Sequence, residues 1–184
     1  MKSKTRNDSE AAELKYSIII KADLKGQDNL TMLMVGTAGN PLTHNGKPGL
    51  DHPGRFANFN LTTVDFDTKW NPDIVCDISN VDDIKVKFAG QKYDLVHMTQ
   101  VIEHIPNLFI VPECLSLLVK PTGFLIVDSP WGPSGPDYHG ELPSFGDYWR
   151  ISKDGFRALF QNKFDILFID DTDANVSCLM KVKA

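Results

Sequence analysis

Short apolar runs that end in polar residues recur along the chain. They cover residues 29–35, 61–66, 73–78, 93–98 and 124–128. Runs of this length without strict alternation are typical of strands in a parallel sheet that is covered on both faces. Polar residues at the carboxyl ends of such strands line the ligand crevice of open α/β sheets. The pattern therefore predicts an α/β protein with a ligand site at that edge of the sheet.

Four segments between these runs have the spacing or the end signals of helices. They lie at residues 10–21, 81–88, 112–119 and 153–162. Gly90 closes the second segment, Pro112 fits only the first turn of the third, and Ser152 caps the fourth. In the first segment, residues 18–20 are three isoleucines, and β-branched residues in a row also favour a strand.

The end of the chain predicts an antiparallel hairpin. Apolar runs at Phe164–Ile169 and Val176–Val182 flank a turn at Asp170–Asn175. No internal repeat or linker interrupts the pattern, so we expect a single domain over residues 29–184. A polar, disordered leader and a helix are expected before it, at residues 1–28.

Two loops rich in proline and glycine, residues 41–60 and 129–146, are long for a compact domain. Such loops often carry function, so we expect the first to form a lid or one wall of the ligand site, and both to carry the specificity for the acceptor. His44, Asp51 and His52 in the first loop match no metal-ligand spacing, and we expect them to face solvent. No metal site is therefore predicted.

Composition and net charge narrow the classes of partner. The chain has 184 residues and a formal net charge of −5, which disfavours binding to a polyanion such as DNA or RNA. The N-terminus has no signal-peptide pattern, and no apolar run approaches the ~20 residues of a membrane helix. We therefore expect a cytoplasmic protein with no nucleic-acid or membrane partner. Its three scattered cysteines are expected to be buried free thiols.

The most informative stretch runs from Tyr93 to Asn107. It begins as a buried strand and then changes to a polar cluster, which contains Thr99, Gln100, Glu103 and His104. Pro106 ends the segment. A central strand that ends in this way predicts a ligand crevice directly after it.

Other expected strands end in carboxylates or small residues. Asp65 ends the second strand, where a carboxylate can accept hydrogen bonds from two ribose hydroxyls. Asp77 ends the third strand in the same way, although ordinary strand-end turns also carry such carboxylates. After the first strand, Gly36–Asn40 contains small residues that let the backbone approach a ligand closely, and an ordinary turn has the same composition.

In this order the motifs resemble class I S-adenosylmethionine-dependent methyltransferases, in particular the methyltransferase type 11-like group. The resemblance spans about residues 29–182, and four segments carry it: Tyr93–Val96, Val101–Asn107, Leu118–Gly123 and Asp147–Ser152. The C-terminal hairpin matches the reversed last strand of that fold. The resemblance implies a Rossmann-like, doubly wound sheet of about seven strands, mostly parallel with an antiparallel C-terminal strand.

The resemblance also implies a cofactor, S-adenosylmethionine, and the positions that hold it. The methionine end of the cofactor is assigned to Gly36, Thr37, Ala38, Thr99 and Gln100, with His104 nearby. The ribose hydroxyls are assigned to Asp65, and the adenine amine to Asp77. The two faces of the adenine are assigned to Phe66 and Ile78.

Departures from the family pattern predict an altered cofactor pocket. Met34 stands where the family usually has an acidic residue, and Ala38 and Asn40 stand where it has more glycine. The first Pro/Gly loop replaces the usual helix after the first strand. The link 67–73 is too short for a helical crossover, which takes about a dozen residues, so one helix layer is expected to be thin.

The predicted reaction is direct transfer of a methyl group to a small-molecule or saccharide acceptor. A general base is needed only when the acceptor is a protonated hydroxyl or amine. His139 and His104 are the catalytic candidates for that role, and Glu141 is a further one. His139 lies in the loop after the fifth strand, on the crevice side, although a solvated loop histidine explains it equally well.

Two other functions compete with this one. A non-catalytic binding or scaffold protein of the same fold agrees with the altered first loop, but it has no need of Asp65 and Asp77. A nicotinamide-dependent oxidoreductase would carry Gly-x-Gly-x-x-Gly after the first strand, and that motif is absent. A reversed last strand would favour the methyltransferase fold over the oxidoreductase.

Overall fold

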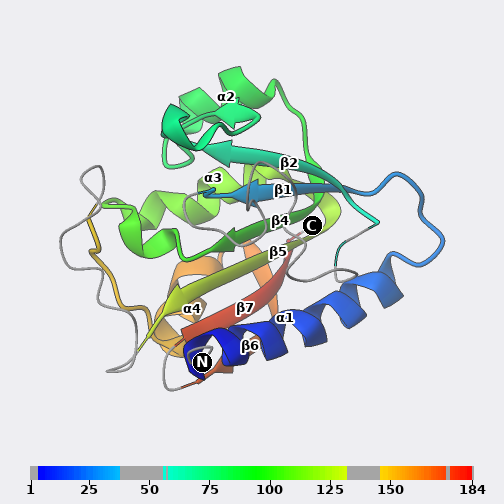
Figure 1. Cartoon of the computed structure of the whole chain (residues 1–184), viewed down its shortest axis with the longest axis vertical. Coiled ribbons are helices and arrows are strands. Elements are labelled where there is room, and N and C mark those ends of the chain that lie inside the picture. The colour runs from blue at the N-terminus through cyan, green and yellow to red at the C-terminus, as the bar shows by residue number, and fades with distance from the viewer. Residues whose placement is uncertain (1–3, 38–55, 57, 132–145, 173–174, 184) are drawn as a thin grey trace.

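A single seven-stranded sheet organises the molecule. The computed structural model describes residues 4–37, 56, 58–131, 146–172 and 175–183, with side chains from residue 11 onward. The strands are β1 (Thr31–Val35), β2 (Asn60–Asp65), β3 (Ile74–Val75), β4 (Tyr93–Thr99), β5 (Val119–Pro130), β6 (Phe164–Asp171) and β7 (Asn175–Val182). Their order across the sheet is β3-β2-β1-β4-β5-β7-β6 (Figure 1).

Strand direction confirms the predicted topology. β1 is parallel to both β2 and β4, β2 is parallel to β3, and β4 is parallel to β5. β7 lies between β5 and β6 and is antiparallel to both. The last strand is therefore the one reversed strand of the described sheet, as the C-terminal hairpin predicted.

Helices cover the two faces of the sheet unequally. The helices are α1 (Lys4–Asp23), α2 (Val81–Phe88), α3 (Val111–Leu118) and α4 (Lys153–Phe160), and the short 3-10 turns are η2 (Thr68–Trp70), η3 (Ile102–His104) and η4 (Leu108–Ile110). Buried residues of α2, α3 and α4 share one hydrophobic cluster, and buried residues of α1 belong to another. Among the described helices, α1 alone lies across the opposite face (Figure 1). The described part of this helix layer is therefore thin, as expected, and the short turn η2 occupies the link between β2 and β3.

Alternation along the central strands explains this division of the core. Leu95 of β4 and Ile126 of β5 pack in the α1 cluster, while their neighbours Val96 and Leu125 pack in the other cluster. Successive side chains of a strand point to opposite faces. Each central strand is apolar on both faces because helices cover both.

Side chains next to the helix ends determine where several helices begin. The Asn80 side chain accepts hydrogen bonds from the backbone N–H groups of Asp82 and Asp83 at the start of α2. Ser152 Oγ accepts from Gly155 N at the start of α4 (3.1 Å). Pro112 lies in the first turn of α3, where a missing N–H leaves no helical bond unmade. The expected late start of α3 is thereby confirmed, and α2 ends at Phe88, where the sequence predicted its end.

Other boundaries differ from the expected ones. α1 begins at Lys4, before the expected start at Glu10, and β3 contains two residues rather than six. The segment Lys120–Gly123, expected as a turn, belongs to β5, whose pairing with β4 is irregular there. A Cβ on Gly123 would lie 2.8 Å from the carbonyl oxygen of Tyr93, so this crossing point admits only glycine.

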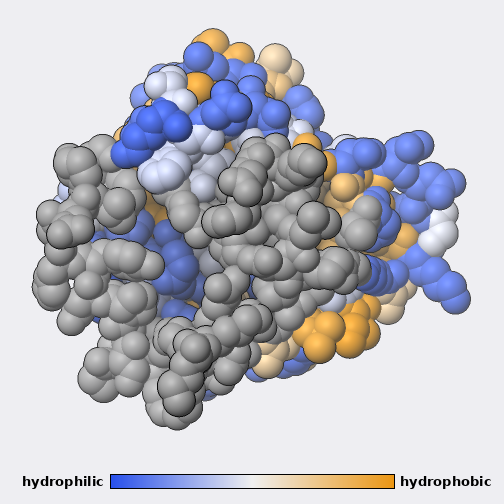
Figure 2. Space-filling model, viewed as in Figure 1, coloured by the Kyte–Doolittle hydropathy of each residue, from blue (hydrophilic) through white to orange (hydrophobic). Residues whose placement is uncertain are grey.

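The outer surface of α1 carries apolar side chains. Leu14 is 51% exposed and Ile18 is 62% exposed. Figure 2 shows apolar surface at the lower right of the molecule, over this helix. None of the described helices is both long and apolar enough to span a membrane. The three cysteines are free and buried, as predicted.

Candidate functional site at the carboxyl edge of the sheet

The carboxyl ends of the parallel strands bring the predicted polar residues to one edge. Val35 of β1 pairs with Val64 of β2 on one side and with Met98 of β4 on the other. Thr99 at the end of β4 pairs with Asp128 of β5. The residues that follow these positions therefore meet at the same edge, as the strand pattern predicted.

Asp65 connects the end of β2 to the loop after β1. Its Oδ2 accepts hydrogen bonds from Thr37 N (2.8 Å) and Thr37 Oγ1 (3.0 Å). Its Oδ1 accepts from Asp67 N (3.0 Å). The side chain is almost fully buried. A carboxylate has about four acceptor positions, so these three bonds leave room for a further donor.

Gly36 makes a close contact that requires glycine. Its φ is +83°, in the left-handed region. A Cβ at this position would lie 2.2 Å from Cγ2 of Val101, which precedes η3. The loop after β1 is therefore packed tightly against the segment after β4.

The positions assigned to adenine lie beside β2 and β3. Phe66 follows β2 and is half-exposed, and Ile78 is buried. Asp77 Oδ1 accepts hydrogen bonds from Ser79 N (2.9 Å) and Ser79 Oγ (2.7 Å), and Asp77 itself is exposed. Ala38, the remaining position of the first loop, lies outside the described residues.

Gln100 is held by a network that the sequence did not predict. It has a left-handed φ of +54°. Its backbone N–H donates to Asp128 O (2.9 Å), and its Nε2 donates to Asp128 Oδ1 (2.5 Å) and Asn175 Oδ1 (3.3 Å). Ser177 Oγ donates to the other oxygen of Asp128. The signal for Asp128 was present in the sequence, because Asp128 directly follows the apolar run 124–127.

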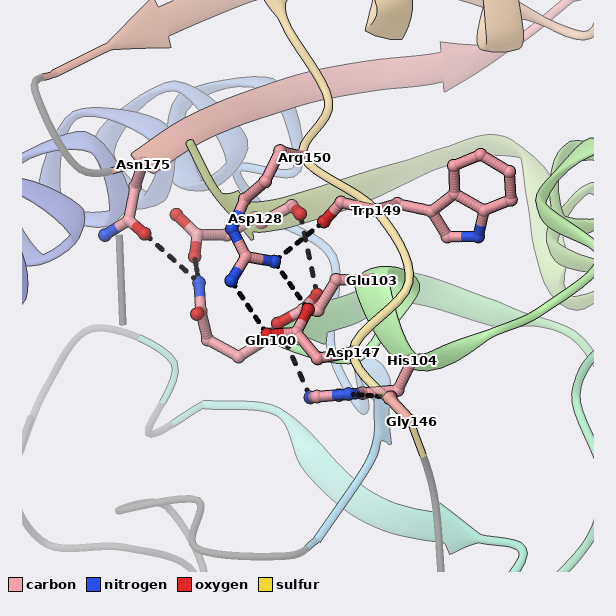
Figure 3. Close-up of polar contacts among 10 residues, drawn as sticks. Gln100, Glu103, His104, Asp128, Gly146, Asp147, Trp149, Arg150 and Asn175 are labelled. Carbon is pink, nitrogen blue, oxygen red and sulfur yellow. Dashed lines mark hydrogen bonds and ion pairs between the residues drawn. The ribbon is translucent and has the colours of Figure 1, made fainter. Parts of the chain in front are cut away.

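Glu103 is a fully buried acid in η3 (Figure 3). Its Oε2 lies 3.5 Å from Ser129 Oγ, and its Oε1 has no hydrogen-bond partner among the described residues. The pKa of Glu103 is raised to about 8, chiefly by burial and also by the Asp128 and Asp147 carboxylates, while a backbone hydrogen bond and Arg150 act to lower it. The side chain is therefore largely neutral near neutral pH.

His104 lies beside Glu103, and the structure shows what each of its two ring nitrogens faces. Its Nδ1 is 2.6 Å from the carbonyl oxygen of Gly146. A carbonyl only accepts, so Nδ1 carries the hydrogen of this bond. Its Nε2 lies 3.7 Å from Glu103 Oε1, which is an ion-pair distance and not a hydrogen bond. In the neutral ring, Nε2 is therefore the nitrogen with a lone pair that can take a proton.

The segment 146–150 packs over η3 and holds it by hydrogen bonds. Tyr148 N donates to Glu103 O (2.8 Å), and Trp149 Nε1 donates to Ile105 O (2.9 Å). Arg150 forms a two-point ion pair with Asp147 (2.5 and 2.7 Å). Figure 3 shows this segment passing over Glu103 and His104. The aromatic residues here hold the site together, and Tyr148 alone among them is more than half exposed.

The other catalytic candidates fall outside this geometry. His139 and Glu141, and the loop residues His44, Asp51 and His52, lie outside the described residues. Within the part of the chain that the structure describes, no three His, Cys, Asp or Glu side chains gather as a metal site.

Comparison with solved structures identifies the fold. The trans-methyltransferase CalH, in complex with SAH, superposes with a TM-score of 0.67 at 16% identity, over 91% of this chain and 55% of that chain. A putative S-adenosylmethionine-dependent methyltransferase from Listeria monocytogenes gives a TM-score of 0.61 at 10% identity, over 95% and 99% of the two chains. The protein has the class I methyltransferase fold. A third methyltransferase, from Clostridium acetobutylicum, gives 0.59 at 12% identity, over 94% and 92%.

This class I methyltransferase fold is shown by structure and not by sequence. No family model and no curated protein matches the chain. The chain spans about half the length of CalH (55%). The reversed β7 favours this fold over the nicotinamide-dependent oxidoreductase, as expected.

Proposed function

We propose that the protein is an S-adenosylmethionine-dependent methyltransferase that acts on a small-molecule or saccharide acceptor. The observation that carries the proposal is the carboxyl edge of the sheet, where Asp65 holds Thr37 and the neighbouring Gly36 packs against Val101, the residue after Gln100. Similar folds support the choice of cofactor. CalH, NodS of Bradyrhizobium japonicum and the 1,6-didemethyltoxoflavin-N1-methyltransferase of Burkholderia thailandensis were each crystallised with S-adenosylhomocysteine.

The residues at this edge suit the chemistry of that cofactor. Asp65 retains acceptor capacity for a ribose hydroxyl. Asp77 bonds Ser79 through one carboxylate oxygen, and the other oxygen can accept from the adenine amine. Phe66 and Ile78 supply an exposed ring and a buried aliphatic surface for the two faces of the base.

The cofactor supplies a methyl group that is already activated by its positively charged sulfur. The protein must hold the acceptor in line with that group and exclude water. η3 is suited to such positioning because three contacts from Gly146, Tyr148 and Trp149 fix its backbone and side chains.

His104 is the described residue best placed to accept a proton from the acceptor. Its Nδ1–H is committed to Gly146 O, so the proton goes to Nε2, where the Glu103 carboxyl lies 3.7 Å away. His139 is the second candidate. Replacing the residue that acts as the base should lower kcat by about 10²- to 10⁴-fold and leave the affinity for S-adenosylhomocysteine unchanged. The measurement compares His104→Asn and His139→Ala, and full activity in both would remove both candidates.

A non-catalytic binding protein is the second proposal, and one observation favours it. Met34 stands where the resemblance expects an acidic residue, and it is buried in β1. An apolar side chain there cannot hydrogen-bond the cofactor. This alternative predicts S-adenosylhomocysteine binding without methyl transfer, or no binding.

Replacing Asp65 with alanine should lower the affinity for S-adenosylhomocysteine by about 10- to 100-fold. The physical reason is the loss of charge-assisted hydrogen bonds, each worth about 1.5–3 kcal/mol, to the ribose and to Thr37. Isothermal titration calorimetry of the variant and the wild type measures the change.

Asp94→Ala is the matched control for this prediction. Asp94 Oδ2 accepts from Thr31 N and Thr31 Oγ1 (both 2.8 Å), so it repeats the Asp65 contact with Thr37 at the start of the parallel strands. Both substitutions should lower thermal stability, but Asp94→Ala should leave the affinity within twofold. Equal affinities for the Asp65 variant and the wild type would contradict the ribose assignment.

A further inference from the structure

The sheet face under α1 changes from apolar to polar near the carboxyl edge. On β4, β5 and β7, Leu95, Ile126 and Leu179 pack in the α1 cluster. Residues two or four positions nearer the edge share this face because side chains alternate along a strand. Those residues are His97, Thr99, Asp128 and Ser177. Glu13 and Tyr16 of α1 therefore reach polar groups of the sheet, whereas Ile20 packs in the apolar core.

The first polar chain runs from α1 to the end of β4. Glu13 Oε1 lies 3.4 Å from His97 Nε2, and Thr99 Oγ1 lies 2.9 Å from the same nitrogen. His97 is almost fully buried, and its Nδ1 has no hydrogen-bond partner among the described residues. A carboxylate only accepts, so a favourable contact with Glu13 requires the hydrogen on Nε2. Thr99 Oγ1 then accepts from His97 and keeps its own hydrogen to donate at the edge.

The second polar chain runs from α1 to Gln100. Tyr16 Oη donates to Ser177 O (2.9 Å), Ser177 Oγ donates to Asp128, and Asp128 accepts from Gln100 Nε2 (2.5 Å). Burial raises the pKa of Tyr16 above its ordinary value, so its hydroxyl remains a donor. Tyr16, Ser177 and Asp128 are all at least nine-tenths buried.

Exposed ion pairs at Lys15 and Asp23 also hold α1, but neither pair contacts Thr99 or Gln100. Lys15 pairs with Asp170 (2.9 Å) and Asp23 pairs with Lys181 (2.8 Å). Exposed pairs contribute little to stability. The two buried chains are different because they end on Thr99 and Gln100, the residues assigned to the methionine end of the cofactor.

We propose that α1 is a positioning element of the cofactor site. Glu13 and His97 orient the Thr99 hydroxyl, and Tyr16 orients the Gln100 amide through Ser177 and Asp128. This inference rests on the proposed function, because it assigns Thr99 and Gln100 to the cofactor. Coupling between two sites is reciprocal, so cofactor binding must also strengthen the docking of α1.

Calorimetric titration with S-adenosylhomocysteine tests the inference through matched substitutions. Tyr16→Phe removes one hydroxyl, and His97→Phe removes the ring donor while keeping a ring of similar size. Each should weaken binding by about three- to tenfold, the range of one hydrogen bond. His97→Gln restores an N–H donor near the Nε2 position and should bind within about threefold of wild type. Asp23→Asn breaks an exposed pair only and should leave the affinity unchanged.

Hydrogen exchange of α1 amides supplies a second measurement. If α1 had a structural role only, cofactor binding would not change the exchange rates of these amides. Addition of S-adenosylhomocysteine should slow exchange across residues 11–23 in the wild type, and this protection should be reduced in Tyr16→Phe and His97→Phe. The inference would be overturned, and the proposed function kept, by one result: the wild type binds, both variants bind within twofold of it, and α1 gains no protection. Absence of wild-type binding would overturn the proposed function and this inference with it.

Discussion

Replacing Glu103 with glutamine should make the protein more stable than wild type above pH 7 and change its stability little near pH 5. Burial raises the pKa of this carboxyl from its ordinary value of 4.5 to about 8. The charged groups that face it are His104, Asp128, Asp147 and Arg150. Glutamine keeps the shape and the neutral state but cannot ionise.

The sign follows from the raised pKa. Between pH 4.5 and about 8 the folded protein keeps a proton on Glu103 that the unfolded chain has lost. The stabilisation that this acid provides is therefore complete below pH 4.5 and is lost as the pH rises towards 8. The free energy of unfolding of wild type should fall by about 1.4 kcal/mol per pH unit relative to Glu103→Gln, and the total difference should reach about 3–5 kcal/mol.

Urea unfolding of the two proteins at pH 5, 6, 7 and 8 measures this difference. Glu113→Gln is the matched control, because Glu113 lies on α3 with an exposed side chain paired to Lys163. That substitution should change stability by less than about 1 kcal/mol and with little pH dependence. A pH-independent difference between Glu103→Gln and wild type would show that Glu103 is ionised in the folded protein.

Gly36→Ala should destabilise the protein by about 3 kcal/mol and lower its melting temperature by roughly 6–12 °C. The new Cβ would lie 2.2 Å from Val101 Cγ2, at a residue whose φ is +83°. The left-handed backbone costs about 1–2 kcal/mol for alanine, and the overlap adds about 1–3 kcal/mol. Because Val101 precedes η3, the displacement should also disturb His104.

Two further variants separate the backbone cost from the overlap. Gly90 has a φ of +84°, and a Cβ added there would meet no heavy atom within 4 Å, so Gly90→Ala carries the backbone cost alone. In a Val101→Ala background, Gly36→Ala should cost no more than Gly90→Ala. Equal losses for Gly36→Ala and Gly90→Ala in the wild-type background would contradict the close packing of the first loop against Val101.

Local signals were enough to predict most of the fold. The signals of Gly90 and Ser152 act over one helical turn, and they predicted the end of α2 and the start of α4. The apolar runs predicted β4 and the C-terminal hairpin because strand burial depends on the run itself. β3 was overestimated because only two of its residues find a partner on β2.

Contacts between distant segments could not be predicted in the same way. Asp128 meets Ser177 and Gln100 only because the sheet places β7 and β4 on either side of β5. The bond from Thr37 to Asp65 depends likewise on β1 lying beside β2. The sequence located the polar residues at strand ends, and the strand order decided which of them touch.

The full length of α1 and its contacts with the sheet also could not be predicted from local sequence. Its apolar spacing indicated a helix, but the buried contacts of Tyr16 with Ser177 and of Glu13 with His97 join residues far apart in the chain. The resemblance to methyltransferases assigned Thr99 and Gln100 to the cofactor without indicating that α1 reaches both. The cofactor assignments themselves remain predictions.

Calorimetric titration of the wild-type protein with S-adenosylmethionine and with S-adenosylhomocysteine tests the central claim most directly. The account predicts saturable binding of at least one of them, with a dissociation constant on the order of micromolar, about −8 kcal/mol. Asp65→Ala in the same titration should bind more weakly, and Asp94→Ala should not. No heat of binding at millimolar ligand would contradict the account and leave the non-catalytic protein of the same fold as the better explanation.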